Sequence, residues 1–345
     1  MRNISIKKYD DSLAQNWDEF IQGHSRNGGI FHERKFLSYH APGKFDDASL
    51  LFYDDKELLG VFPAAIINND GVKKIVSHPG STNGGLVYAN SSTLDTVLSM
   101  LEAMIEYYKT QGADTIEMKI AEPISNAFPD GELTYLLWHR GFRISTQEIS
   151  TCVKLSDNKS WETFCRKRNL SYIRKLEREG VAVREIEDIE IVYPLIEANL
   201  KIRYKKKPTH SKEELNKLKE LYPDRIHYWI AEKDKNVFGA LVLFDINNIA
   251  VHSFYIAKNE LLGDTKVMPL LFHKVFEHYH TKGFTWFNFG ISSRGQQIKW
   301  GILEFKETVG GRATGRQVWS IDNLSLYQRY QPEDKGEEVT KETTV

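Results

Sequence analysis

An α/β fold with two similar units in one chain is the class that the sequence predicts. Its 345 residues suffice for about two domains, and helical and β-type patterns return in one order in both halves. That order is helices, three β-runs, a helix that ends at a glycine, a strand and a final strand. The residues themselves do not repeat, so the repetition lies in the pattern alone. We expect an N-terminal unit over residues 1–155 and a C-terminal unit over 160–330, each a mixed twisted sheet flanked by helices.

The first unit shows each of these patterns. After an amphipathic helix over residues 11–22, three β-type runs separated by turn residues predict an antiparallel meander; they are Ser49–Tyr53, Leu58–Ile67 and Val72–Val76. Apolar residues from Leu94 to Tyr108 then recur at helical spacing, and Gly112 is placed to end that helix. Ile116, Met118 and Ile120 alternate as in a strand.

The second unit follows a basic helix over residues 160–179, which we interpret as a solvated face that joins the two units. Phosphate contact by its cations, Arg166 among them, is the alternative. Ser211 and Glu214 form a capping box that opens a helix. Three further β-runs and a helix over 266–282 complete the repeated order.

Composition excludes several classes of protein. The hydrophobic fraction of 41% is typical of a globular enzyme or binding protein, and a net charge of -1 gives no global attraction to DNA or membrane. No apolar leader and no membrane span is evident, and Cys152 and Cys165 lack a metal-type spacing, so we expect a reduced, cytoplasmic protein. Residues 331–345 are polar and acidic, which predicts a disordered tail.

Histidines give no metal site in this interpretation. His273, His278 and His280 lie in one predicted helix but do not have the i, i+4 spacing of helical zinc ligands. We therefore expect no metal.

The most informative stretch runs from Phe284 to Arg312. Aromatic and β-branched residues predict a strand that Gly290 breaks, and a polar loop follows. An amphipathic helix then ends at Gly310-Gly311. A strand that ends in a glycine, followed by a cation-bearing loop and a helix start, is suited to hold an anion.

The same string resembles a known family. A strand ending in Phe289-Gly290, a polar loop, and Ile302-x-x-Phe305-Lys306-x-x-x-Gly310-Gly311 is similar to the C-terminal half of FemAB-like acyltransferases, including BioF2-like acetyltransferase domains. That family belongs to the GNAT superfamily and carries two GNAT units in one chain. The resemblance covers most of the chain to about Trp319 and implies an N-acyltransferase with two tandem GNAT-like units.

The resemblance also implies roles for individual residues. In peptidoglycan-acting relatives an arginine meets the acceptor's diphosphate, and that role falls on Arg203. The other residues implied on the acceptor side are His32, Lys35, Ser77, His78, Gly84, Gly85 and Tyr204. The residues implied near the acyl donor are Phe289, Gly290, Ser292, Ser293 and Lys306.

Two departures bear on the donor. Relatives that use aminoacyl-tRNA commonly carry a coiled-coil insertion, and no such heptad run occurs here. The usual acyl-CoA turn is replaced by Asn259–Asp264, with one glycine. Acyl-CoA as co-substrate, without a tightly bound cofactor, is the interpretation that we favour. Aminoacyl-tRNA and a non-catalytic, ligand-binding GNAT pair are the alternatives.

Acyl transfer needs a neutral amine about 3 Å from the carbonyl and donors for the oxyanion. Lys306 and Arg294 are the candidate donors or phosphate partners. His252 and Tyr255 are further catalytic candidates, but their spacing places them on opposite faces of a strand, so only one can face the site.

The expected acceptor is a small or nucleotide-linked amine, such as an amino sugar or a precursor in cell-envelope polysaccharide biosynthesis. We expect five residues from distant segments to share one cleft with Lys306: His32, Lys35, Ser77, His78 and Arg203.

Overall fold

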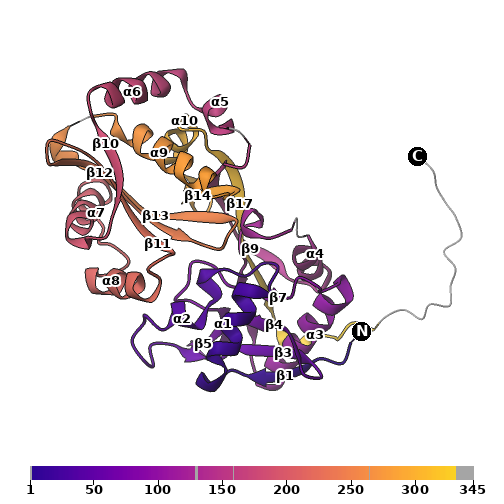
Figure 1. The fold of residues 1–345 in the computed structure, drawn as a ribbon. Helices are drawn as coiled ribbons and strands as arrows, with labels where there is room; N and C mark the ends of the chain where they lie inside the picture. Colours follow the sequence, from indigo (N-terminus) through magenta and orange to yellow (C-terminus); the bar gives the residue numbers. More distant parts are fainter. Residues whose placement is uncertain (1, 129–130, 158, 264, 332–345) are drawn as a thin grey trace, which may run out of the picture.

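The computed structural model describes residues 2–128, 131–157, 159–263 and 265–331. Two α/β halves lie beside one another, and one eleven-stranded mixed sheet runs through both (Figure 1). The predicted α/β class is confirmed. Beyond Gln331 the predicted tail lies outside the described residues, and the boundary between residues 155 and 160 stays a prediction.

The N-terminal half contains short helices and two groups of strands. Its strands are β1 (Ser5–Lys8), β2 (Asp46–Asp47), β3 (Leu50–Asp54), β4 (Glu57–Phe62), β5 (Ala64–Asn69), β6 (Val72–Ser77), β7 (Val87–Tyr88), β8 (Thr115–Lys119) and β9 (Arg143–Lys154). Its helices are η1 (Asp11–Leu13), α1 (Ala14–Gly23), η2 (Ile30–His32), α2 (Arg34–Leu37), α3 (Leu94–Thr110), η3 (Pro123–Ser125) and α4 (Glu132–His139).

The C-terminal half is richer in long helices. Its strands are β10 (Ala182–Ile186), β11 (Ile226–Lys233), β12 (Asn236–Asp245), β13 (Ala250–Lys258), β14 (Trp286–Ile291), β15 (Ser293–Arg294), β16 (Gln297–Ile298) and β17 (Arg312–Asp322). Its helices are α5 (Ser160–Phe164), α6 (Lys167–Arg178), α7 (Ile189–Tyr204), α8 (Lys212–Leu221), η4 (Glu260–Leu262), α9 (Val267–Thr281), α10 (Trp300–Thr308) and η5 (Leu324–Leu326).

The two halves exchange their last strands. The large sheet has the order β10-β11-β12-β13-β14-β9-β17-β8-β6-β5-β2. Strand β9 of the first half therefore pairs with β14 of the second, and β17 of the second pairs with β8 of the first. In each half one parallel pair, β13 with β14 and β6 with β8, lies next to this junction. The exchange joins both halves into one sheet.

The predicted meander of the first half is wrong in one respect. Strands β3 and β4 belong to a separate four-stranded sheet with β1 and β7, whereas β5 and β6 belong to the large sheet. The predicted run Leu58–Ile67 is divided at Pro63, which lies between β4 and β5. Because proline has no backbone N–H to donate to a ladder, the chain can leave one sheet and enter the other at this residue.

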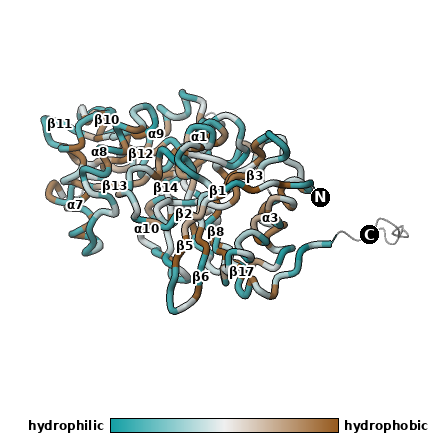
Figure 2. The backbone as a smooth tube through the Cα atoms, turned by 90° about the horizontal axis from the view of Figure 1, so that it is seen from below, coloured by the Kyte–Doolittle hydropathy of each residue, from teal (hydrophilic) through white to brown (hydrophobic). Residues whose placement is uncertain are grey.

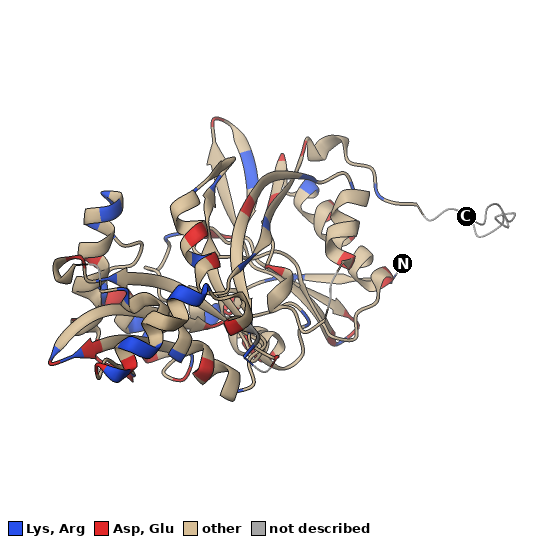
Figure 3. Ribbon diagram, turned by 90° about the horizontal axis from the view of Figure 1, so that it is seen from above, with Lys and Arg blue, Asp and Glu red and all other residues tan. Residues whose placement is uncertain are grey.

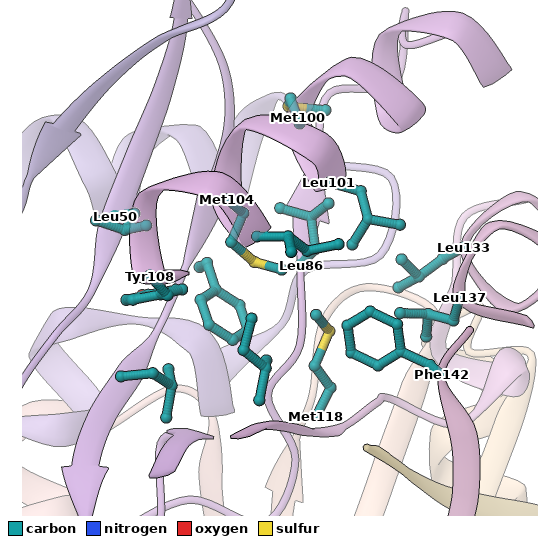
Figure 4. Packing of buried hydrophobic residues seen from close by; sticks show 14 of the residues in the cluster. Leu50, Leu86, Met100, Leu101, Met104, Tyr108, Met118, Leu133, Leu137 and Phe142 are labelled. Carbon is teal, nitrogen blue, oxygen red and sulfur yellow. The ribbon is translucent and has the colours of Figure 1, made fainter. Parts of the chain in front are cut away.

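Apolar side chains from α3, α4 and both sheets form the core of the N-terminal half (Figure 4). Leu101 and Met104 of α3 pack towards Met118 of β8 and Phe142 ahead of β9. Hydrophobic stretches of the chain coincide with packed elements such as β5, β8 and α3 (Figure 2). The helical spacing of α3 therefore reports its buried face.

Helices cover both faces of the sheet in the C-terminal half. Helices α7 and α8 pack on one face of β11, β12 and β13, and α9 packs on the other. The turn between β12 and β13 reaches the first half, where Ile30 N donates to Ile246 O at 2.8 Å and Asn247 Nδ2 donates to Ser125 O at 2.7 Å. These bonds fix one half against the other.

Candidate active site

The candidate site begins where β13 and β14 separate. The two strands pair over Ala250–His252 and Trp286–Asn288, and the pairing of β14 with β9 then shifts between Asn288 and Ile291. Gly290 lies in this bulge with φ +73°, and a Cβ on it would lie 3.1 Å from His252 Cε1. A glycine is required both by the left-handed backbone and by the close histidine ring.

Lys306 on α10 closes this end of the strand. Its Nζ donates to Gly290 O at 2.7 Å, to Ile291 O at 2.9 Å and to Ser292 Oγ at 3.0 Å. The side chain is 2% exposed, and burial lowers the pKa of Lys306 to about 7, against the smaller raising effect of Glu122. The prediction that Lys306 points to the loop after β14 is confirmed.

A cavity of about 970 Å³ opens beside Lys306. The cavity lies between the ends of α7, β13, α9 and α10. Its volume is at the upper end of the range for ordinary ligand sites. Six of its described lining side chains are cationic: Arg166, Arg203, Lys258, Lys266, Lys299 and Lys306. Among the same residues Glu304 is the acidic one. Acidic and basic residues occur together over the rest of the molecule (Figure 3), so this excess of cations is local.

Arg203 and Tyr204 line the same cavity as Lys306. Arg203 Nε donates to Glu260 Oε1 at 2.5 Å, which holds the guanidinium near the outer part of the cavity. Three predicted site residues from two distant segments are thus brought together. Their roles stay predictions.

The prediction that His252 and Tyr255 lie on opposite faces of their strand is wrong. The register of β13 against β12 passes from Ser253 to Tyr255, so Phe254 is an extra residue in a bulge. The Phe254 ring lies 6.0 Å from His252 and 5.1 Å from Tyr255, on the face that α7 and α8 cover. One inserted residue reverses the alternation of every later side chain.

Neither ring lines the cavity. Burial, followed by the charges of Arg316 and Lys306, lowers the pKa of His252 to about 3, so its ring is neutral at pH 7. Tyr255 Oη accepts a bond from His210 N at 3.0 Å inside the core.

The other residues predicted near the donor support the strand end. Ser292 Oγ lies 3.2 Å from Thr151 Oγ1, and Ser293 Oγ accepts from Ile149 N at 2.9 Å, so both serines tie the loop to β9. Phe289 is buried in an aromatic cluster with its ring 4.8 Å from that of Phe272. Arg294 is exposed on the short β15–β16 hairpin and does not line the cavity.

The residues predicted on the acceptor side in the first half fill the space between β6 and β8. His32 Nε2 donates to Gly84 O at 3.1 Å, Gly84 N donates to Lys119 O at 2.7 Å, and Ser77 Oγ accepts from Lys119 N at 2.7 Å. A Cβ on Gly85, at φ +96°, would lie 3.2 Å from Ile120 Cγ2. These residues pack the interior.

His78 and Lys35 lie elsewhere. The His78 ring packs 4.8 Å from Phe45, and burial lowers the pKa of His78 to about 4. Lys35 lines a separate cavity of about 520 Å³ with its Nζ 5.0 Å from the Tyr222 ring. The structure therefore does not bring the five expected residues into one cleft.

Two cavity residues were not among the predicted site residues, although Arg166 belongs to the basic helix for which phosphate contact was the alternative interpretation. Arg166 precedes α6 and Lys266 precedes α9, so each stands at a helix end that only the fold brings to Lys306. A cation directly before an amphipathic helix is the available hint, and it is weak. Of the segment Asn259–Asp264, considered above as a replaced acyl-CoA turn, the structure describes residues 259–263, and none of these lines the cavity.

Comparisons with known proteins show the fold. No family model and no curated protein matches the sequence. Among solved structures, FemX superposes with a TM-score of 0.70 at 12% identity, covering 94% of this chain and 98% of FemX. L-PGS from Bacillus licheniformis has a TM-score of 0.56 at 13% identity, covering 90% and 91% of the two chains.

A tandem GNAT protein from the clavulanic acid biosynthesis pathway, solved without AcCoA, has a TM-score of 0.52 at 10% identity over 93% and 99% of the two chains. Within the described residues, no helix combines the length and the apolar character needed to cross a bilayer.

The comparisons with solved structures show that this chain has the FemAB-like fold of two tandem GNAT-type units.

Proposed function

We propose that this protein is an N-acyltransferase that moves an acyl group from acyl-CoA to the amine of an amino sugar, a nucleotide-linked sugar or a cell-envelope precursor. The observation that carries the proposal is the buried Lys306 at the inner end of a large cavity lined by cations. The tandem GNAT fold supports it.

The cations suit a donor that bears phosphates. Arg166 and Arg203 can each form two parallel bonds to a phosphate, and the lysines add point charges. A phosphate held in the outer part of the cavity would direct the attached acyl group inwards, towards the end of β14. Positioning of this kind supplies a large part of the rate enhancement in acyl transfer.

The reaction itself makes modest demands. The acceptor nitrogen attacks the thioester carbon, the C–N bond forms, the C–S bond breaks, and the proton lost by nitrogen leaves with the thiol. Lys306 now donates to two backbone carbonyls and a hydroxyl, which is the full set of donors of an ammonium group. Turning one N–H towards the developing oxyanion would stabilise the transition state.

Thiol release tests the proposal. Purified protein is incubated with acetyl-CoA and a panel of amino sugars, and free thiol is measured. We expect release that depends on both substrates and that Lys306→Met removes. In a parallel arm, aminoacyl-tRNA replaces acetyl-CoA and a peptidoglycan-type precursor replaces the sugars. Product in this arm alone would reassign the donor, and product in neither, with the acyl donor still bound, would favour a ligand-binding protein.

A further inference from the structure

We propose that the group transferred by this protein is an uncharged aliphatic acyl chain of several carbons, held against an apolar wall inside the cavity. We call this surface the acyl wall, and it is made of Ile256, Val267, Met268, Ile298, Ile302 and Phe305. The inference deepens the proposed function because it names the chemical class of the acyl group. It rests on acyl-CoA as the donor.

The side chains that line the cavity separate by exposure. Four of the cations are exposed, so they stand at its mouth: Arg166, Arg203, Lys266 and Lys299. The side chains of the acyl wall are buried or half-buried, and Val267 is only 1% exposed. The charged groups therefore surround the opening, and the wall behind them is apolar.

The acyl wall belongs to the packed core of the C-terminal half. Ile256 comes from β13, Met268 from the first turn of α9, and Phe305 from α10. Met268 is held from behind, since a Cβ on Gly239 of β12 would lie 2.8 Å from Met268 Sδ. The Phe305 ring lies 5.9 Å from that of Phe272. These contacts fix the shape of the wall before a ligand binds.

Polar side chains among the lining residues are hydrogen-bonded within the protein. Asn169 Nδ2 donates to Thr308 O at 2.9 Å, and Asn199 Nδ2 donates to Lys258 O at 3.3 Å. Lys306 donates to two backbone carbonyls and a serine hydroxyl. Because the protein itself occupies these groups, an acyl group in the interior meets mainly carbon atoms.

A charged acyl group fits such an interior poorly. The ammonium group of an aminoacyl donor would stand near Lys306 as a second cation and would need a carboxylate partner. Among the described lining residues Glu304 is the acidic one, and it is exposed at the mouth. A methylene chain needs no partner, and its transfer out of water is favourable.

The extent of the acyl wall points to a chain longer than acetyl. The cavity has a volume of about 970 Å³, and six apolar side chains face it. An acetyl group ends in a single methyl group and would leave most of these side chains without a partner. A chain of several carbons would cover them.

Calorimetric titration of the full chain with acyl-CoA thioesters tests the inference. Acetyl-CoA, butyryl-CoA and octanoyl-CoA are compared in the absence of an acceptor. We expect the Kd to fall about three- to fourfold for each added methylene that the wall buries.

Two matched ligands test the charge of the acyl group. β-Alanyl-CoA has an ammonium group where butyryl-CoA has its terminal methyl group, and succinyl-CoA has a carboxylate there. Each should bind about tenfold or more weakly than butyryl-CoA, because the charge would lose water without gaining a partner.

A variant of the acyl wall and a matched control complete the experiment. Ile302→Trp on α10 fills space in front of the wall, so it should reduce the preference for octanoyl-CoA over acetyl-CoA about tenfold or more. Ile191 on α7 is 36% exposed and does not line the cavity, so Ile191→Trp should keep the wild-type preference. Both variants are checked for an unchanged melting temperature, and the ligand series on the wild type decides the inference without them.

Equal Kd values for acetyl-CoA and octanoyl-CoA would overturn the inference and assign the wall to the pantetheine arm, which all these ligands share. Tighter binding of β-alanyl-CoA or succinyl-CoA than of butyryl-CoA would overturn it as well. Thiol release with an amino sugar as acceptor separates the two proposals. Release that is fastest from acetyl-CoA and falls with chain length keeps the acyltransferase and removes the aliphatic acyl group. Binding that tightens with chain length, without release from any thioester, keeps the acyl wall and removes the acyltransferase.

Discussion

In each half of the molecule two parallel strands pair and then separate, and we call this point the junction of that half. The space at the two junctions is filled differently. In the C-terminal half β13 and β14 separate beside a cavity of about 970 Å³ that ends at Lys306. In the N-terminal half, β6 and β8 pair in parallel in the same way, but Gly84 then forms a bridge with Ile120 and its carbonyl accepts a bond from His32. One junction is open to a ligand, and the chain itself fills the other.

This difference shows why polar residues next to a glycine-bearing loop do not by themselves predict a site. Ser77, Gly84 and His32 have hydrogen-bond partners within the N-terminal half, as buried polar groups generally do. In the C-terminal half the cavity is lined by ionisable side chains, and burial lowers the pKa of Lys306 to about 7 because its charged form is costly to bury. This difference favours the C-terminal half as the place of the proposed chemistry.

The largest expected effect belongs to Lys306. Lys306→Met should lower turnover by about 100- to 1,000-fold, because a donor aimed at the oxyanion is worth about 3 to 4 kcal/mol. Lys306→Arg should restore turnover only in part, since its planar fork places the charge elsewhere. Initial rates with saturating acetyl-CoA and amino sugar give the measurement.

Thermal melting serves as the control for both variants. Methionine fills much of the space of lysine without a buried charge, so the melting temperature of Lys306→Met should not fall. Unchanged rates in both variants would remove Lys306 from the site and leave it as a support for the end of β14.

His227 is a second buried basic side chain, and its pKa is raised whereas that of Lys306 is lowered. His227 Nδ1 lies 2.5 Å from Glu185 Oε1, and Nε2 lies 3.3 Å from Asp245 Oδ2. Burial lowers its pKa, but the bonds and charges of Asp245 and Glu185 outweigh this and raise the pKa of His227 to about 9. The stabilisation that His227 contributes is complete below about pH 6.5 and is lost as pH rises through 9, a change of about 3 kcal/mol.

Ionisation of Lys306 changes the stability with pH in the opposite direction. Its lowered pKa means that the unfolded state binds the proton more tightly, so its destabilising effect is complete below pH 7 and vanishes as pH rises towards 10.5. Urea unfolding at pH 6 and at pH 9.5 measures both terms. The stability advantage of the wild type over His227→Gln should shrink at the higher pH, and that of Lys306→Met over the wild type should shrink as well. A pH-independent difference for either pair would contradict the assignment.

Substitution of Gly85 at the filled junction should cause a moderate loss of stability. Gly85→Ala should lower the free energy of unfolding by about 2 kcal/mol, because alanine is strained at φ +96° and meets Ile120. Gly112→Ala, at φ +71° with no neighbour within 4 Å, isolates the strain from the crowding. Urea unfolding measures both variants.

Activity is the readout that distinguishes packing from binding at this junction. Well below its melting temperature, Gly85→Ala should keep wild-type turnover. Lost turnover at full stability would instead support the prediction that Gly84 and Gly85 bind substrate, and the contrast between the halves would fail.

Local chemistry was predictable from the sequence where one segment decides it. The Ser211–Glu214 capping box is present, with Ser211 N donating to Glu214 Oε2 at 2.9 Å, and Lys306 reaches Ser292 as the spacing within 284–312 suggested. The resemblance to FemAB-like proteins led to the fold, which no periodicity alone would have distinguished from other α/β folds.

What the sequence could not predict depends on pairing between distant segments. A bulge at Phe254 reversed the faces of β13, and Pro63 sent β4 and β5 to different sheets. The exchange of β9 and β17 leaves no local trace, because strand patterns specify buried faces but not partners. The cavity gathers cations from five segments for the same reason, so nothing in the sequence groups Arg166 or Lys266 with Lys306.

The smallest expected effect is that of removing an exposed arginine from an ion pair. Two such pairs of the C-terminal half can be compared, one at the cavity and one at the edge of the sheet. Arg203 pairs with Glu260 and is 47% exposed, and Arg184 pairs with Glu232 on β10 and is 52% exposed. Such exposed pairs contribute little to stability, so Arg203→Ala and Arg184→Ala should have the same melting temperature. If Arg203 meets a substrate phosphate, Arg203→Ala should raise the KM of that substrate by about three- to tenfold while leaving kcat nearly unchanged, because the lost contact acts on ground and transition states equally. Steady-state kinetics with each substrate varied in turn show which of the two carries the phosphate. Equal KM values in Arg203→Ala and Arg184→Ala would reduce Arg203 to a surface residue, and the open junction would then bind its ligand through the deeper cations alone.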